Sequence, residues 1–289
     1  MKHKLLLLLP LLPMAIAAQT QSLVPTIIGG SPVSTAPSWV TALTLKSGNL
    51  YYQFCGGSLI APQWVVTAAH CLDDSTNDTN LLRLIIGETT LSTASQYHAV
   101  DRVIIHPAWQ GEASGDFTGD IALLHLTSAV DLSPIPLADA NAAESLATGT
   151  LLRAYGWGVT TATSVTTSDT LQQVDLPYVG FNSQTEADHF LAGGNAGEDT
   201  CYGDSGGPLT YADTLYGITS YGTSICALSG EPAAYTSVGS YLPWINGYVT
   251  DTPTDSSSSG GGALALLGLG LLGWGAYRGR HRPDSHKIT

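Results

Sequence analysis

Cys201-Tyr202-Gly203-Asp204-Ser205-Gly206-Gly207-Pro208 is the stretch from which the fold and chemistry of this chain are inferred, because it places a serine on a tight turn between glycines. Gly203 and Gly206 allow backbone angles that other residues avoid, so the Ser205 hydroxyl can protrude from the turn. The N–H groups of Gly203 and Ser205 then converge on one point beside that hydroxyl. The stretch therefore predicts a nucleophilic serine next to an oxyanion hole.

A serine hydroxyl is a weak nucleophile at neutral pH, so this prediction requires a histidine base and a carboxylate elsewhere in the chain. His70 lies upstream in Thr67-Ala68-Ala69-His70-Cys71, and Asp120 precedes the apolar run 121–124. A buried carboxylate can accept a hydrogen bond from a histidine Nδ1–H and hold its tautomer. Asp116 lies in the same loop, but the apolar run favours Asp120 as the partner of His70.

Four further histidines lie between the ends of the chain, and we expect each of them to be structural: His98, His106, His125 and His189. His106 follows a predicted strand, and His125 lies in the apolar stretch after Asp120. His70 is therefore the candidate base.

Beyond the serine stretch, six short motifs occur in the order in which they occur in the chymotrypsin-like (trypsin-type) serine endopeptidases. They are Ile27-Ile28-Gly29-Gly30, Cys55-Gly56-Gly57-Ser58-Leu59-Ile60, the His70 block, the Asp120 block, Gly156-Trp157-Gly158 and Tyr241-Leu242-Pro243-Trp244-Ile245. The chain resembles this family over residues 27–249. The resemblance implies two antiparallel β-barrels, about 27–135 and 140–240, with a C-terminal helix and a site in the cleft between them.

The resemblance also implies a role for each candidate residue. Ser205 attacks the scissile carbonyl, and His70 takes its proton and returns it to the leaving amine. Asp120 orients the imidazolium, while the Gly203 and Ser205 N–H groups hold the oxyanion. The expected activity is hydrolysis of peptide bonds in protein or peptide substrates through an acyl-enzyme. The alternatives are a non-catalytic binding module of the same fold and a protease with non-tryptic specificity.

Asp199 occupies the place where trypsin-like members carry the acid at the floor of the primary pocket. A buried carboxylate there selects a long cationic side chain, so we expect cleavage after Arg or Lys. The resemblance implies pocket walls at Ser220, Gly222 and Ala233. Trypsins usually have glycine where Ala233 aligns, so the extra methyl narrows the pocket and favours the planar guanidinium of Arg over Lys.

In this family, cleavage before the Ile27 motif frees an α-amine that folds inward and pairs with Asp204. The pairing fixes the Gly203 N–H, and loss of one side of a buried ion pair costs about 3 to 5 kcal/mol. Trypsin-like zymogens usually carry Arg or Lys before the junction, whereas this chain has Thr26. We therefore expect a separate activating protease.

Four cysteines in an exported chain are expected to be paired rather than reactive or metal-bound. The resemblance implies Cys55 with Cys71, worth about 3 kcal/mol in the chain-entropy model, and Cys201 with Cys226. Other pairings of four cysteines are open from the sequence. Leu191 stands where many members of the family have a cysteine, so a further family disulfide is absent.

Runs rich in Val, Ile, Thr, Tyr and Leu, separated by Gly, Asn, Asp and Pro, predict an all-β barrel or sandwich. No long 3.6-residue periodicity interrupts them. The predicted strands include residues 40–45, 63–68, 81–86, 99–105, 151–155, 171–178, 208–211, 215–221 and 234–238. Residues 126–140 are expected to cross between the barrels, and residues 241–248 to form the closing helix.

The N-terminal end has the pattern of a secretory signal. Two lysines precede the apolar run 5–18, and small residues near its end suit signal peptidase. Residues 1–18 are therefore predicted to be a signal peptide, and residues 19–26 a short propeptide.

At the C-terminal end, residues 250–262 have the composition of a flexible linker. The apolar segment 263–277 is short for a spanning helix, which needs about 20 residues, and a basic stop follows at Arg278, Arg280 and Arg282. Residues 263–289 resemble the GlyGly-CTERM sorting tails of secreted Gram-negative bacterial proteins, which a rhomboid-like protease (rhombosortase) is thought to process. The resemblance implies membrane contact until the tail is removed; a permanent anchor is the alternative.

Between residues 27 and 259, four basic residues stand against 22 acidic ones, a net charge of about −18. This balance makes nucleic acid an unsuitable partner. The excess of acidic residues is consistent with three explanations: a need for solubility, a saline habitat, or an enzyme that cuts after Lys or Arg and itself contains few of them. The segment 87–97, in the place of the trypsin calcium loop, offers only Glu88 as an acidic ligand, whereas calcium takes six to eight oxygens. We expect no metal and no cofactor.

Overall fold

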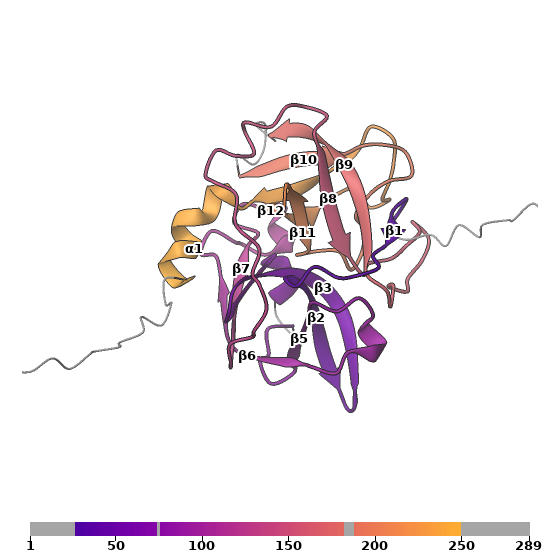
Figure 1. Cartoon of the computed structure of the whole chain (residues 1–289). Coiled ribbons are helices and arrows are strands. Elements are labelled where there is room, and N and C mark those ends of the chain that lie inside the picture. The colour runs from indigo at the N-terminus through magenta and orange to yellow at the C-terminus, as the bar shows by residue number, and fades with distance from the viewer. Residues whose placement is uncertain (1–26, 74–75, 182–187, 250–289) are drawn as a thin grey trace, which may run out of the picture. The chain divides into compact units, whose positions relative to one another are not determined.

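The structure is a computed structural model that describes residues 27–73, 76–181 and 188–249 (Figure 1). The predicted signal peptide, propeptide, linker and C-terminal tail all lie outside the described residues. Within them the fold is two closed antiparallel β-barrels followed by a short helix. The predicted fold class is confirmed.

The first barrel is closed in the order β2-β3-β4-β7-β6-β5. Its strands are β2 (Val40–Ser47), β3 (Leu50–Ala61), β4 (Trp64–Thr67), β5 (Leu82–Ile86), β6 (His98–Ile105) and β7 (Ala122–Leu126). Leu43, Leu59, Val66, Leu84 and Leu123 are among the fully buried side chains that fill it. The strands predicted at 40–45, 63–68, 81–86 and 99–105 correspond to β2, β4, β5 and β6.

The second barrel closes because β8 pairs with both β9 and β11. Its strands are β8 (Leu151–Gly156), β9 (Gln172–Phe181), β10 (His189–Gly193), β11 (Pro208–Tyr211), β12 (Thr214–Tyr221) and β13 (Pro232–Ser237). The two-residue strand β1 (Ser31–Pro32) adds to β9. Leu152, Leu176, Phe190, Leu209 and Tyr235 lie in its core.

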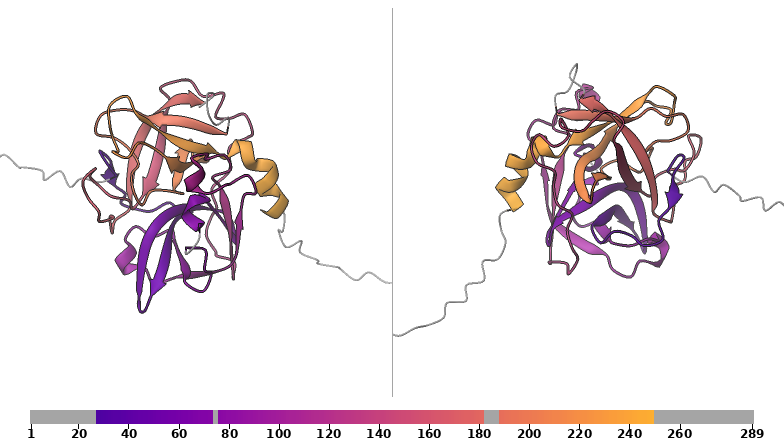
Figure 2. Two further views of the ribbon diagram at one scale, coloured as in Figure 1. Left: turned by 180° about the vertical axis from the view of Figure 1, so that it is seen from behind. Right: turned by 45° about the horizontal axis from the view of Figure 1, so that its top comes forward.

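The helix α1 (Leu242–Val249) follows the last strand, close to the predicted 241–248. Its buried Ile245 belongs to the same apolar cluster as the core of the first barrel, together with Ile218 and Val238 of the second half. The helix therefore helps to join the two barrels (Figure 2). Short 3₁₀ turns occur at His70–Leu72, Leu91–Thr93, Glu112–Ser114 and Gly239–Tyr241. No helix in the described ranges is long and apolar enough to cross a membrane.

All four cysteines lie in the described part of the chain and form two disulfides, Cys55–Cys71 and Cys201–Cys226. The first ties β3 to the 3₁₀ turn that begins at His70. The second ties the segment before Ser205 to residue 226, on a loop between β12 and β13. Both bonds therefore restrain segments that carry candidate site residues.

Candidate active site

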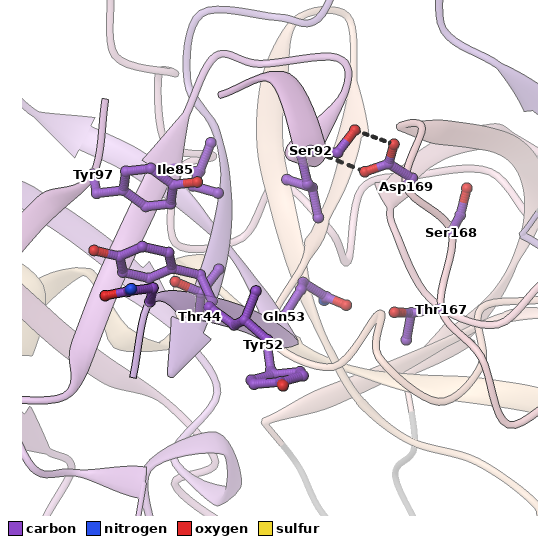
Figure 3. A pocket seen from close by; sticks show the side chains of 13 residues that line it. Thr44, Tyr52, Gln53, Ile85, Ser92, Tyr97, Thr167, Ser168 and Asp169 are labelled. Carbon is purple, nitrogen blue, oxygen red and sulfur yellow. Dashed lines mark hydrogen bonds between the residues drawn. The ribbon is translucent and has the colours of Figure 1, made fainter. Parts of the chain in front are cut away.

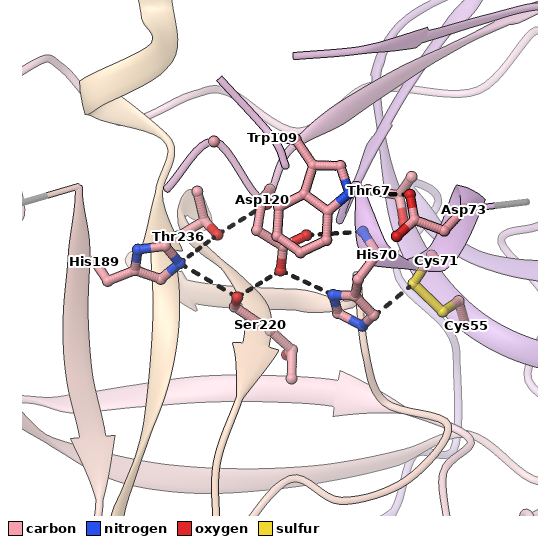
Figure 4. A network of polar contacts seen from close by, with 12 residues as sticks. Cys55, Thr67, His70, Cys71, Asp73, Trp109, Asp120, His189, Ser220 and Thr236 are labelled. Carbon is pink, nitrogen blue, oxygen red and sulfur yellow. Dashed lines mark hydrogen bonds and ion pairs between the residues drawn. A yellow bond between two sulfur atoms is a disulfide. The ribbon is translucent and has the colours of Figure 1, made fainter. Parts of the chain in front are cut away.

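His70 begins the 3₁₀ turn after β4, and two hydrogen bonds orient it toward Asp120 (Figure 4). Its backbone N–H donates to Asp120 Oδ1 at 2.9 Å, and its Nδ1 lies 2.8 Å from Asp120 Oδ2. The imidazole is 10% exposed and the Asp120 side chain is fully buried. Because a carboxylate can only accept, Nδ1 carries the proton and Nε2 is left as a base.

Asp120 lies two residues before β7, at the end of the first barrel, and residues of the second barrel complete its environment. The Ser220 hydroxyl donates to Asp120 Oδ2 at 2.5 Å, and the Thr236 hydroxyl donates to the Asp120 carbonyl at 2.9 Å. Burial alone would raise the pKa of Asp120, but the charge and hydrogen bonds of His70 and the bond from Ser220 lower it overall. The carboxylate is therefore ionised at neutral pH.

Burial lowers the pKa of His70, while the charge and hydrogen bond of Asp120 raise it, and the net shift is upward from 6.5. Glu112 and Asp73 add smaller contributions in the same direction. This arrangement stabilises an imidazolium whenever Nε2 takes up a proton.

The turn that carries Ser205 requires its glycines. Gly203 and Gly206 have φ angles of +93° and +76°. A Cβ at Gly206 would lie 2.2 Å from the Thr67 hydroxyl oxygen and 2.6 Å from the Gly56 carbonyl oxygen. The Gly56 N–H in turn donates to the Ser205 carbonyl at 2.7 Å. The serine turn is therefore pressed directly against the first barrel.

Gln53 in β3 is a residue of this region that the sequence analysis missed. Its side-chain Nε2 donates to the Gly203 carbonyl at 2.8 Å and to the Cys55 carbonyl at 3.1 Å. The contact with Gly203 spans 150 residues of sequence, so no local pattern could have indicated it. Gln53 braces the loop that carries the Gly203 N–H.

One pocket of about 290 Å³ brings together two of the predicted reacting residues and the predicted specificity residues. His70 and Ser205 line it, and so do the predicted specificity residues Asp199, Ser220, Gly222 and Ala233. A Cβ placed on Gly222 would lie 3.6 Å from the Ala233 methyl carbon. A single methyl group on Gly222 would therefore already be in van der Waals contact with Ala233. The space between these two walls of the pocket is narrow.

Asp199 lies in this pocket and is 6% exposed. Its Oδ2 accepts a hydrogen bond from the Ala227 N–H at 2.9 Å, whereas its buried Oδ1 has no partner among the described residues. Burial raises the pKa of Asp199 to about 6, against smaller lowering by the Ala227 and Thr200 N–H groups. A buried carboxylate with an unused oxygen is suited to a cationic group that enters the pocket.

Asp204 is fully buried beside the serine turn. Its two carboxylate oxygens accept from the Gly158 N–H at 2.8 Å and the Cys201 N–H at 2.9 Å. Burial raises the pKa of Asp204 to about 7, and these hydrogen bonds only partly offset it. Ile27 is also completely buried, in the core of the second barrel.

The other titratable candidates do not line the pocket that contains Ser205. Asp116 accepts from the Thr118 N–H in an exposed loop. The His106 ring contacts Tyr241 and Trp244, and His125 pairs with Asp101. His189 is buried and contacts Ser220 and Thr236. His98 lies in β6, where burial lowers its pKa.

Two other features add no reactive group to those already described. Within the described ranges one cluster has metal-ligand spacing, Cys55, His70 and Cys71, but both sulfurs are in a disulfide and cannot act as thiolates. A second pocket, of about 480 Å³, is lined by tyrosines 51, 52 and 97 and by residues 167–169 (Figure 3). Its charged residue, Asp169, is engaged by the Ser92 N–H and hydroxyl.

The sequence matches the family model described as Trypsin over residues 27–245. The chain belongs to the trypsin family of serine proteases. It is 35% identical over 271 residues to mouse tryptase, which covers 85% of this chain and 97% of the tryptase. It is 34% identical over 249 residues to bovine chymotrypsin-like elastase family member 1, covering 76% and 88% of the two chains. Brachyurin of Leptuca pugilator is 32% identical over 235 residues, covering 78% and 100%.

Membership of the trypsin family makes the protein a serine endopeptidase that binds protein or peptide substrates. Trypsin-family proteases are typically secreted, which agrees in general terms with the expected export. The relatives named above are animal proteins, and their names, tryptase, elastase and brachyurin, differ from one another.

Proposed function

We propose that this trypsin-family protease is exported and cleaves peptide bonds after Arg or Lys, with Ser205, His70 and Asp120 as its reacting groups. The observation that carries the proposal is the single pocket lined by His70, Ser205 and Asp199. The chemistry and the selection of a cationic side chain then take place within one cavity.

In the acylation step, the Ser205 oxygen forms a bond to the substrate carbonyl carbon while its proton passes to His70 Nε2. The carbonyl electron pair moves to the oxygen, which the Gly203 and Ser205 N–H groups stabilise; one such donor is worth about 3 to 4 kcal/mol. When the C–N bond breaks, His70 gives its proton to the leaving amine. Water then attacks the acyl-enzyme by the same route and releases Ser205.

Support for Arg or Lys specificity comes from the unused Oδ1 of Asp199. The narrow approach between Gly222 and Ala233 favours a flat guanidinium over an ammonium, since the guanidinium can also form a bidentate pair with a carboxylate. The alternative is a non-tryptic specificity, because elastase and brachyurin are among the relatives. Cleavage of a peptide library by the mature enzyme distinguishes the two.

We propose that activation frees the Ile27 amine, which pairs with Asp204. The burial of both residues and the raised pKa of Asp204 support this proposal, because a buried carboxylate gains from a cationic partner. With Thr26 before the junction, an activating protease other than this enzyme makes the cut. N-terminal sequencing of the active form should begin at Ile27, and pure zymogen should not convert itself.

We further propose that residues 1–18 direct export from a Gram-negative bacterium and that residues beyond about 262 are removed by a rhombosortase-like enzyme. The composition of these segments supports this proposal. Intact-mass analysis of the mature protein tests it: a chain that still ended at Thr289 would favour a permanent anchor.

The test of the triad is Ser205→Ala. Turnover should fall on the order of a million-fold, because the nucleophile is lost, while binding of a peptide substrate should survive. Wild-type hydrolysis by this variant would overturn the mechanism. A wild-type protein that bound peptides without cleaving any would favour the non-catalytic module.

A further inference from the structure

A second histidine lies behind the His70–Asp120 pair. His189 in β10 is fully buried and stands opposite Thr236 of β13 in the sheet. Its Nε2 lies 3.2 Å from the Ser220 hydroxyl oxygen and 3.1 Å from the Thr236 hydroxyl oxygen (Figure 4). These are the two hydroxyls that donate to Asp120. The His189 imidazole therefore contacts both hydroxyl groups of the second barrel that donate to Asp120.

The bend of β12 explains how Ser220 reaches both partners. Thr219 pairs with Tyr235 and Tyr221 with Ala234, so Ser220 is the extra residue of a β-bulge. A bulge re-aims a side chain relative to the regular alternation of a strand. The Ser220 hydroxyl is thus directed into the space between His189 and Asp120.

The available protons determine which way the bonds run. Ser220 and Thr236 have one hydroxyl proton each, and these donate to Asp120 Oδ2 at 2.5 Å and to the Asp120 carbonyl at 2.9 Å. Only lone pairs of the two hydroxyls are then left to face His189 Nε2. An N–H at Nε2 satisfies them, whereas a bare Nε2 would draw one hydroxyl proton away from Asp120. Because Nδ1 faces the Asp188 carboxylate, which can only accept, this arrangement requires a proton on each ring nitrogen of His189.

Asp188 completes the arrangement on the other side of the ring. Its Oδ1 lies 3.1 Å from His189 Nδ1, and its Oδ2 accepts from the Tyr241 hydroxyl and from the Gly119 N–H. Although burial acts to raise the pKa of Asp188, the bonds from His189 and Tyr241 lower it to about 2. The ionised carboxylate therefore fixes the His189 ring and also the residue directly before Asp120.

We propose that Asp188 and His189 are positioning residues for catalysis: together they hold the Ser220 and Thr236 hydroxyls with both protons directed at Asp120. His189 touches no substrate and acts through Asp120 on the orientation of His70. This inference rests on the proposed roles of His70, Asp120 and Ser205.

Two uncharged substitutions of His189 separate its two sides. His189→Gln can place an amide N–H near the position of Nε2, so it retains a donor to Ser220 and Thr236. His189→Asn retains a group near Nδ1 and Asp188 but does not reach the hydroxyls. We expect kcat to fall about tenfold in His189→Asn, the rate equivalent of one net hydrogen bond, and less than about threefold in His189→Gln. KM should stay within about twofold for both.

A purely structural role predicts something different, namely that kcat loss follows the melting temperature of each variant. The ¹H NMR resonance of the His70 Nδ1–H should also shift in His189→Asn more than in His189→Gln, because it reports the bond to Asp120. The matched control is His125→Asn, which makes the same change at another His–Asp contact, with Asp101, on the surface of the first barrel. It should leave kcat and the resonance unchanged.

A double-mutant cycle tests whether His189 acts through the hydroxyls. In a Ser220→Ala, Thr236→Val background, His189→Asn should change kcat by less than about twofold, since coupled residues are not additive. A wild-type kcat in His189→Asn would overturn the proposal. So would equal losses of kcat in His189→Asn and His189→Gln that follow their melting temperatures. Full additivity of the substitutions in the double-mutant cycle would overturn it as well. If His189→Asn does not fold, Asp188→Asn replaces it and should lower kcat with KM unchanged. Failure of Ser205→Ala to abolish turnover would instead overturn the underlying mechanism.

Discussion

The Ser220 hydroxyl of the second barrel donates a 2.5 Å hydrogen bond to Asp120 of the first barrel, across 100 residues of sequence. Ser220 also lines the pocket that contains Asp199. A single side chain therefore links the carboxylate that is hydrogen-bonded to His70 with the wall of the pocket that Asp199 lines. This contact couples the relative placement of the two barrels to the geometry of the reacting groups.

The first prediction concerns the pH dependence of the base. His70 must be neutral to accept the Ser205 proton, and its pKa is raised above 6.5. The kcat/KM should therefore fall as the pH drops through a value above 6.5. Asp120→Asn should lower kcat about ten-thousandfold at neutral pH, because the wrong tautomer of His70 is then favoured. A pH–rate profile measures both effects.

The matched control for that substitution is Asp116→Asn, which makes the same change in the exposed part of the same loop. It should keep the wild-type profile. An equal loss in both variants would mean that Asp120 has no special role.

The second prediction concerns Asp199. Asp199→Ser should abolish cleavage after Arg while Ser205 still reacts with a small acylating inhibitor, since only the charge at the pocket floor is lost. In the wild type, inhibition by benzamidine should weaken as the pH falls through the Asp199 pKa of about 6, where the carboxyl becomes protonated. The control is Asp175→Ser, which removes an exposed carboxylate that forms an ion pair with Arg153. Unchanged Arg preference in Asp199→Ser would refute the assignment.

The third prediction concerns the width of the pocket. Ala233→Gly removes the methyl that stands 3.6 Å from a Cβ position on Gly222. The ratio of kcat/KM for Arg substrates to that for Lys substrates should fall severalfold, toward one. The reason is that the wider pocket then accommodates the ammonium group of a substrate Lys together with a water molecule. Paired Arg and Lys peptides give this ratio directly. A ratio that rose or stayed constant would show that Ala233 does not restrict the pocket.

The fourth prediction concerns activation. In the uncleaved chain, burial raises the pKa of Asp204 from 3.8 to about 7, so the folded state holds a proton that the unfolded state releases between these values. Stability should therefore fall as the pH rises through this window, by on the order of a few kcal/mol. A free Ile27 ammonium supplies the missing charge and should remove this loss.

Urea unfolding of the Ser205→Ala chain at pH 5 and pH 8, before and after cleavage at Ile27, measures the difference. Asp204→Asn should reduce the pH dependence of the uncleaved form, and the raised pKa of Asp199, about 6, accounts for part of what is left. Equal pH dependence before and after cleavage would contradict the proposed Ile27–Asp204 pair.

The local signals alone predicted an all-β barrel or sandwich, and the resemblance to the trypsin-type proteases supplied the arrangement of two barrels. Runs rich in Val, Ile, Thr, Tyr and Leu predicted β2, β4, β5 and β6 and most strands of the second barrel. The glycines at Gly203 and Gly206 were also evident from the sequence, and their φ angles are positive. His70, Asp120 and Ser205 were identified as candidate site residues from their residue types and their order in the chain.

Only the tertiary structure decided which groups meet. The Gln53 contact with Gly203, the Ser220 bond to Asp120 and the His189 network join residues 150, 100 and 31 positions apart. Closure of each barrel and the bulge at Ser220 create these contacts, and both depend on strand register rather than on local preference. His189 looked structural in the sequence for this physical reason: its partners become neighbours only when β10, β12 and β13 lie side by side.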